Sequence, residues 1–334
     1  MSIFRDFFVK EKPVFTGITR GLGGFGFGSG SGGGEEEGFS ASGGSKFSLS
    51  GYTYHVFLSS GSFVVAEGSK DVELVAIGGG GSGGYFYGSG GGAGGCCHAT
   101  AFPMTPGTYT CTVGDGASAP GNSQSVGSKG SHSEIYKGSP GPSSSNVYAT
   151  GGGGGGYNGA PTPSDPWGPG GCPGGVNHPL AGLNSSFPSS TQHPSVTKYS
   201  GDGGKGSPSN VDAGGGGGGI GGGGSGTQGG PGRAFAMLPG PEIYPLLPSP
   251  DQSTVGTVWR DTLGPTGLIG GGGNGYNLDV APGGPSIPTR PGGGGSGTAT
   301  YFNGVNYTGS GGRGPSNPGV PGTGGKGLIV IRYQ

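Results

Sequence analysis

Apolar residues are scarce in this sequence. Hydrophobic residues occupy 29% of its 334 positions, whereas globular chains usually carry about 45–50%. That supply fills one small cluster of packed side chains and excludes two ordinary domains. We expect backbone hydrogen bonding between glycine segments to hold the rest of the chain.

Charge is also scarce, and its absence excludes several classes of partner. Charged residues make up 10% of the chain and the formal net charge is −1. A near-neutral chain offers no basic patch for nucleic acid, and too little charge to keep an unfolded chain soluble by self-repulsion. No stretch approaches the ~20 apolar residues of a membrane span. We therefore expect no nucleic-acid partner and no membrane insertion.

A secretory leader and a cysteine framework are missing as well. Arg5 and Asp6 interrupt the first apolar residues, and no continuous apolar region follows. We expect a soluble chain made in a cytoplasm.

The four cysteines show no CxxC pairing. Buried reduced thiols are the favoured interpretation. A metal site built from Cys96, Cys97 and His98 is the alternative, but adjacent ligands rarely close a tetrahedral site without a second pair. We expect no metal and no cofactor.

Motifs for catalysis lack specific support. Gly80–Gly84 satisfies G-x-S-x-G, but such matches arise by chance at this glycine content. The five histidines are scattered, and acidic residues cluster only at Glu35–Glu37. Since no pair of carboxylates is evident, an enzyme such as a glycan depolymerase is not favoured, and we predict that the chain is not an enzyme.

Glycine, in contrast, is abundant. The chain has 93 glycines and 29 prolines, a content typical of disorder when it has no period. Many of the glycines stand in runs, here called the glycine tracts. These are Gly78–Gly81 with its continuation to Gly95, Gly151–Gly156, Gly214–Gly219 with Gly221–Gly224, Gly270–Gly273 and Gly292–Gly295.

The tracts have two interpretations, a disordered linker or an ordered bundle. Short apolar segments precede several of them, as Val75–Ile77 precedes Gly78, and a linker would not need these. Glycine can form an extended helix with three residues per turn, and six residues at ~3.1 Å rise span about 19 Å. Without Cβ atoms such helices can approach until their backbones bond laterally. We favour a bundle of polyglycine-II helices.

Several segments are predicted to form β-strands because they are rich in aromatic and β-branched residues. They are Phe47–Leu49, Tyr52–Leu58, Ser62–Ala66, Val72–Ile77, Gly107–Val113 and Gly327–Tyr333. The first and last strands of the glycine-rich region are its most apolar parts. We therefore expect these strands to pair or pack together and to close the domain. The fold class is therefore mostly β and irregular: a short antiparallel sheet or sandwich closes the bundle of polyglycine-II helices, with an extended N-terminal anchor.

Residues 1–27 are distinct from the rest and form a predicted docking segment. Its apolar residues either fold back or insert into a partner protein, and insertion is favoured; they are Phe4, Phe7, Phe8, Val14, Phe15 and Ile18. Residues 28–46 are predicted to be a flexible linker of Gly, Ser and Glu. Residues 47–334 form the predicted glycine-rich domain.

Four runs in order resemble the glycine-rich domains of tailed-bacteriophage tail-fibre and virion proteins, which are common in phages of marine bacteria. These runs are Tyr54–Val65, Val72–Gly81, Thr105–Gly114 and Gly327–Tyr333. Residues 4–20 also resemble short N-terminal segments of such phages' structural proteins. The resemblance implies a virion component, made in a bacterial host cytoplasm, in which loops joining polyglycine helices contact the host, as in adhesins of T-even-like phages. The long Pro-rich loops do not align, so no receptor-contacting residue carries over.

Aromatic residues in the predicted loops are candidates for receptor binding, because rigid rings give large contact area at little entropic cost. They are Tyr85, Tyr87, Trp167, Phe235, Tyr244, Trp259, Tyr276 and Tyr301. The alternative is that they cover the glycine bundle or seal an oligomer interface.

The resulting hypothesis is a virion protein of the tail-fibre type. Its N-terminal segment docks on a phage tail or capsid protein, and its loops bind a host-surface glycan or outer-membrane protein. Virion fibres are often trimeric, so we expect a homotrimer. The alternative is a capsid-decoration or tail-assembly protein without a receptor.

Overall fold

The computed structural model describes residues 38–121, 125–157, 171–175, 192–202, 214–276, 292–295, 302–315 and 319–334. The six predicted docking residues between Phe4 and Ile18 lie outside the described residues. So do Trp167 and Tyr301, two of the predicted binding residues.

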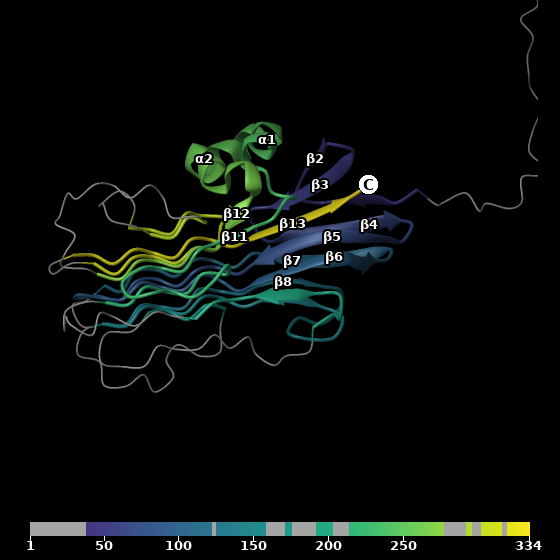
Figure 1. Ribbon diagram of the computed structural model, residues 1–334. Coiled ribbons are helices and arrows are strands. Elements are labelled where there is room, and N and C mark those ends of the chain that lie inside the picture. The colour runs from purple at the N-terminus through teal and green to yellow at the C-terminus, as the bar shows by residue number, and fades with distance from the viewer. Residues whose placement is uncertain are drawn as a thin grey trace, which may run out of the picture. The chain divides into compact units, whose positions relative to one another are not determined.

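A five-stranded antiparallel sheet is built from short strands spread over the first half of the chain (Figure 1). In spatial order its strands are β1 (Ser40–Ser42), β4 (Gly61–Glu67), β7 (Gly107–Thr112), β8 (Ser133–Tyr136) and β9 (Val147–Ala149). The predicted strands at 62–66 and 107–113 are β4 and β7.

A six-stranded antiparallel sheet includes the last strand of the chain. In spatial order its strands are β10 (Thr197–Tyr199), β6 (Cys96–Met104), β5 (Lys70–Ile77), β13 (Leu328–Tyr333), β3 (Tyr52–Phe57) and β2 (Ser45–Leu49). β13 lies between β3 and β5, where Ile329 pairs with both Phe57 and Ala76. The predicted pairing of the C-terminal strand with the earlier apolar strands is confirmed, and so is the mostly β and irregular fold class.

The two sheets share one core, because strand residues alternate between faces. Leu74 and Ile329 of the six-stranded sheet belong to the same buried cluster as Phe63 and Ile135 of the five-stranded sheet. All four side chains are completely removed from solvent.

The opposite face of the six-stranded sheet packs against helices (Figure 1). These are α1 (Gly240–Ile243) and α2 (Ser249–Leu263), with 3-10 turns η1 (Tyr244–Leu246) and η2 (Gly264–Thr266). The α2 residues Val255, Trp259 and Leu263 recur every four positions, so they lie on one face of the helix. They form a second buried cluster with Val75 and Val330 of the sheet.

The prediction that Phe235, Tyr244 and Trp259 lie in a loop was wrong, because much of residues 231–266 forms regular secondary structure. Besides the helices, this region holds β11 (Arg233–Ala234), which pairs with β12 (Leu268–Ile269). Prolines gave the region a loop-like composition, yet Pro250 stands in the first turn of α2, where a missing N–H costs little. Gly256, at φ 69°, interrupts the helical backbone within α2, and the helix is held by the packing of its apolar face.

Part of the predicted linker is also ordered. Residues 38–46 contain β1 and the start of β2. Ala41 is buried at 3% exposure, and the ring of Phe39 meets that of Tyr333 edge-on at 4.6 Å. These two apolar contacts hold the segment on the core, so residues 38–46 are not a flexible linker.

Glycine segments run outward from the ends of the strands and return (Figure 1). Residues 78–85 leave β5, and residues 88–95 lead back to β6. Gly78 N donates to Gly95 O beside the strands, and Gly84 N donates to Ser89 O at the far end. The turn at 85–87 therefore lies at the end of this hairpin that is farthest from the sheets, here called the distal end.

Backbone hydrogen bonds of segment 78–85 repeat every three residues. Residues 78, 81 and 84 donate to segment 89–95, residues 79, 82 and 85 donate to segment 125–131, and residues 80 and 83 donate to segment 322–325. The donor–acceptor distances are 2.8–3.0 Å. A strand directs its backbone groups to two sides with a period of two, so this segment bonds in three directions rather than as part of a sheet.

At many positions the tracts pack too closely for a side chain. A Cβ atom on Gly81 would lie 2.0 Å from Gly153 O, and one on Gly84 would lie 2.0 Å from Gly156 O. Both obstructing atoms belong to backbone, which cannot rotate away. Glycine is therefore required here by the distance between neighbouring chains.

Candidate functional site

Aromatic side chains gather at the distal end. The turn that joins segments 78–85 and 88–95 is made of Tyr85, Phe86 and Tyr87, all half-buried. The Tyr87 ring lies 5.1 Å from Phe86 and 5.0 Å from Tyr276, which ends the outward segment 270–276. Two of the predicted binding residues, Tyr87 and Tyr276, are thus in direct contact although they are far apart in the sequence.

The backbone of this turn is unusual. Phe86 and Tyr87 both have φ of 50°, a left-handed conformation that costs free energy for residues with side chains. Glycine would adopt it without strain, and glycine surrounds the turn. The two rings occupy positions where the local backbone alone would favour glycine.

Arg313 lies close to Tyr276 and was not among the predicted binding residues. Arg313 is 9% exposed, and its guanidinium carbon lies 5.2 Å from the centre of the Phe302 ring. Burial lowers the pKa of Arg313, and the phenol of Tyr276 acts in the opposite direction. The signal available in the sequence is a single cation within the glycine-rich run 309–314.

We call Tyr87, Tyr276, Phe302 and Arg313 the distal cluster. It joins aromatic faces, which stack on apolar or sugar surfaces, to one cation. It holds no carboxylate, imidazole or thiol, so the cluster can bind but has no general acid–base pair or strong nucleophile.

Three other predicted binding residues lie near the sheets. Trp259 is 1% exposed and its Nε1 donates to Tyr307 O at 3.0 Å. Phe235 is 5% exposed and packs its ring against His98 and Tyr199. Both side chains fill the core between the helices and the sheet and offer no ring to a ligand, so we leave them out of the candidate site. Tyr244 is half-buried beside Arg260.

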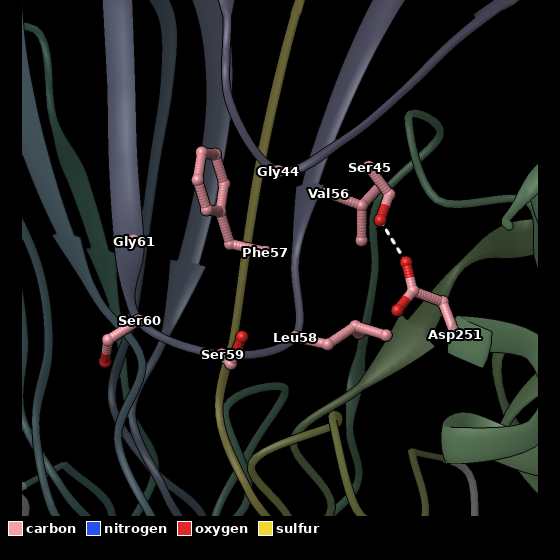
Figure 2. Close-up of a pocket in the computed structure, with 9 residues that line it drawn as sticks. All are labelled: Gly44, Ser45, Val56, Phe57, Leu58, Ser59, Ser60, Gly61 and Asp251. Carbon is pink, nitrogen blue, oxygen red and sulfur yellow. Dashed lines mark hydrogen bonds between the residues drawn. The ribbon is translucent and has the colours of Figure 1, made fainter.

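A pocket of about 230 Å³ opens between the β3–β4 turn and α2 (Figure 2). Three serines and three apolar residues line it beside glycine backbone, and the Ser45 hydroxyl donates to the Asp251 carboxylate across it. One carboxylate already bonded to a hydroxyl can hydrogen-bond a small polar molecule. The pocket lining includes no second acid or base for catalysis.

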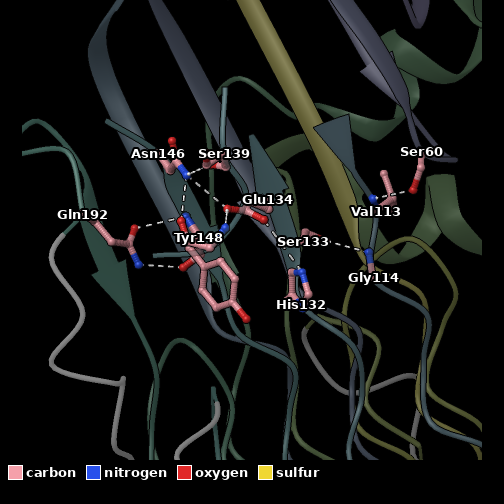
Figure 3. Close-up of polar contacts among 11 residues, drawn as sticks. Ser60, Val113, Gly114, His132, Ser133, Glu134, Ser139, Asn146, Tyr148 and Gln192 are labelled. Atoms are coloured by element: carbon pink, nitrogen blue, oxygen red, sulfur yellow. Dashed lines mark hydrogen bonds and ion pairs between the residues drawn. The ribbon is translucent and has the colours of Figure 1, made fainter. Parts of the chain in front are cut away.

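Polar side chains around β8 and β9 form a network (Figure 3). Glu134 accepts hydrogen bonds from Gly141 N at 2.6 Å and Asn146 Nδ2 at 3.3 Å, and His132 Nε2 lies 3.9 Å from its other oxygen. Burial raises the pKa of Glu134 above its usual range. The carboxylate is used to hold the loop between the two strands, which indicates a structural role.

A second ionic group lies on the helix-facing side of the six-stranded sheet. Arg332 binds Glu73 at 2.6 Å and Tyr54 at 2.8 Å, and His98 binds the other Glu73 oxygen at 3.1 Å. Desolvation opposes ionisation of Glu73, yet its bonds to His98 and Arg332 leave its pKa below the ordinary value. The partners satisfy one another, so this group fastens four strands, β3, β5, β6 and β13.

The four cysteines are free and buried. Burial raises the pKa of Cys97, Cys111 and Cys172 to about 12, so these thiols are protonated and unreactive at neutral pH. Within the described parts of the chain, no group of three or more His, Cys, Asp or Glu is placed to hold a metal ion. No helix in those parts is long and apolar enough to cross a membrane.

Comparison with known proteins gives one finding. The sequence model of a family described as a glycine-rich domain matches residues 56–334. No curated protein matches the chain.

Proposed function

The chain belongs to the glycine-rich domain family, and we propose that it is a phage virion protein of the tail-fibre type. In this proposal residues 1–27 dock on a tail or capsid protein, and the distal cluster meets the surface of the host cell. The resemblance of four sequence runs to phage fibre domains supports the virion assignment.

The observation that carries the proposal is the backbone network of the glycine segments. Segment 89–95 repeats the pattern of 78–85: residues 89, 92 and 95 donate to segment 150–156, residues 90 and 93 to segment 215–218, and residues 91 and 94 to segment 309–312. Three residues per turn is the period of polyglycine II. We therefore propose that these segments are polyglycine-II helices bonded on all sides.

Such a bundle suits an adhesin because it presents loops on a stiff support. Backbone hydrogen bonds anchor described segment ends at the distal end: Gly156 O accepts from Ser89 N at 2.8 Å, and Tyr276 N donates to Gly88 O at 3.0 Å. A ligand that binds Tyr87 and Tyr276 then pays little entropy to order them. Several copies on one particle, as in the homotrimer we expect, would turn weak contacts into strong adsorption.

The test uses particles that carry the chain with Tyr87→Ala or Tyr276→Ala. Tyr136→Ala serves as the matched control, since Tyr136 is half-buried at the end of β8. We expect the adsorption rate to fall at least tenfold for the first two variants, with normal particle yield, and to stay unchanged for the control.

A fall in particle yield with unchanged adsorption per particle would contradict the receptor role and favour an architectural one. Absence of the chain from the peptides of purified particles would contradict the virion assignment altogether.

A further inference from the structure

Arg313 carries a charge that the described part of the fold does not neutralise. No side-chain hydrogen bond or ion pair joins it to any described residue, and its Nε is buried without a partner. Its backbone, in contrast, is fully used: Arg313 N donates to Phe302 O and Arg313 O accepts from Gly322 N, both at 2.8 Å. The segment is held by its backbone and has no need of the side chain.

An unpaired buried guanidinium is costly, because a charge taken out of water loses its hydration. Other arginines of the described residues avoid that cost. Arg332 binds Glu73 and Tyr54, and Arg260 binds Asp261 in solvent. Arg313 is nine-tenths buried, and the described residues give it neither remedy, which leaves its guanidinium available to an anionic ligand.

The surroundings of Arg313 define what that partner is. Phe302 covers one side of the guanidinium at 5.2 Å. Tyr276 is close enough to influence the Arg313 charge, and its ring contacts Tyr87. Most of the backbone groups that bond to segment 309–314 belong to glycines. A ligand here meets one cation and several aromatic faces, with no described acid paired to that cation.

We propose that Arg313 is the anion-recognising residue of the distal cluster, and that the ligand is a saccharide bearing an anionic group, a carboxylate or a phosphate. A guanidinium offers parallel N–H donors that match both groups, while the rings of Tyr87 and Tyr276 stack on sugar faces. This inference rests on the proposed function, because it names the chemical class of the receptor.

The first experiment is an NMR titration of the purified full chain that follows the Arg313 Nε–Hε signal, assigned by its loss in Arg313→Met. The probes are D-galacturonate, D-galactose 6-phosphate and neutral D-galactose. We expect one or both anionic sugars to shift the signal and to bind at least tenfold more tightly than galactose.

A response to galacturonate alone identifies a carboxylate sugar, and a response to the phosphate alone identifies a phosphosugar. Equal responses to all three probes, or a response to none, would overturn the proposal.

The second experiment compares variants. Arg313→Met is expected to weaken binding of the responding sugar at least tenfold, whereas Arg233→Met, which removes an exposed arginine stacked on Tyr199 beside the sheets, leaves it unchanged. Arg313→Met should melt at the same temperature as the parent chain or higher, because it removes an unpaired buried charge. A lower melting temperature would mean that Arg313 serves the fold, and would overturn the proposal.

These measurements use the purified chain rather than particles, so a negative result for the anion site can be told apart from a negative result for the proposed function. If the purified chain ignores anionic sugars while Tyr87→Ala particles adsorb poorly, the anion site is wrong and the adhesin role stands. If the chain binds an anionic sugar through Arg313 but Tyr87→Ala particles adsorb normally, the anion site stands and the receptor role is wrong.

Discussion

At the scale of single residues, Gly81 shows how the bundle depends on the absence of a side chain. A Cβ atom there would meet Gly153 O at 2.0 Å, whereas one on Gly121 would meet nothing within 4 Å. We expect Gly81→Ala to lower the free energy of unfolding by about 3 kcal/mol or more, as severe overpacking does. Gly121→Ala should change it by less than about 0.5 kcal/mol. Chemical denaturation measures both, and similar values for the two variants would contradict close backbone packing.

Glu134 gives a prediction about pH. Burial raises its pKa above the ordinary 4.5, so the folded chain binds this proton more tightly than the unfolded chain. The contribution of this proton to the free energy of unfolding is therefore fully present below pH 4.5, and it is lost as the pH rises through the folded pKa. Glu134→Gln removes the titration and keeps an oxygen to accept from Gly141 N. We expect the variant to gain stability relative to the parent between pH 4 and pH 7, measured by thermal melts; a parallel pH dependence of the two proteins would contradict this.

At the scale of elements, Trp259 links α2 to Tyr307, which lies just before the glycine-rich run 309–314. Its indole fills the core and its Nε1 donates to Tyr307 O. Trp259→Phe keeps most of the ring but leaves Tyr307 O without that donor, and we expect a cost of about 1–3 kcal/mol. Trp259→Ala should cost about 3–5 kcal/mol. Urea denaturation measures both; a cost near zero for the alanine variant would show that α2 does not pack as described.

The elements differ in how well the sequence predicts them. β5 and β13 were predicted because both are apolar and β-branched, and such segments form strands wherever they can be buried. β6 was not predicted, because Cys96–Met104 has no such run and is held as a strand by pairing with β5 and β10. α2 was missed because its prolines and Gly256 hid the four-residue spacing of Val255, Trp259 and Leu263.

The sequence names only part of the candidate site, for a similar reason. Tyr87 and Tyr276 were found because they interrupt glycine runs, and their contact follows from two outward segments ending together. Arg313 was overlooked because nothing local marks a lone arginine as buried. Its burial results from packing against segments far away in the sequence, and the local sequence around Arg313 does not predict that packing.

At the scale of the whole molecule, two kinds of interaction stabilise the fold, and one gives way to the other at the ends of the strands. Side-chain packing holds the sheets and helices, with Leu74, Trp259 and Ile329 among the fully buried residues. Backbone hydrogen bonds hold the glycine segments, which have almost no side chains to bury. The small apolar content of the sequence is enough because it is concentrated in the sheet region.

Hydrogen exchange of the tract amides tests this account most directly. Gly79, Gly152 and Gly217 are bonded donors in three different segments, so we predict that their amides exchange at least a hundredfold more slowly than in an unstructured peptide, with protection approaching that of Val75 in β5. Exchange of these amides at the rate of a free glycine peptide, while Val75 stays protected, would contradict an ordered bundle and show that the tracts are linkers.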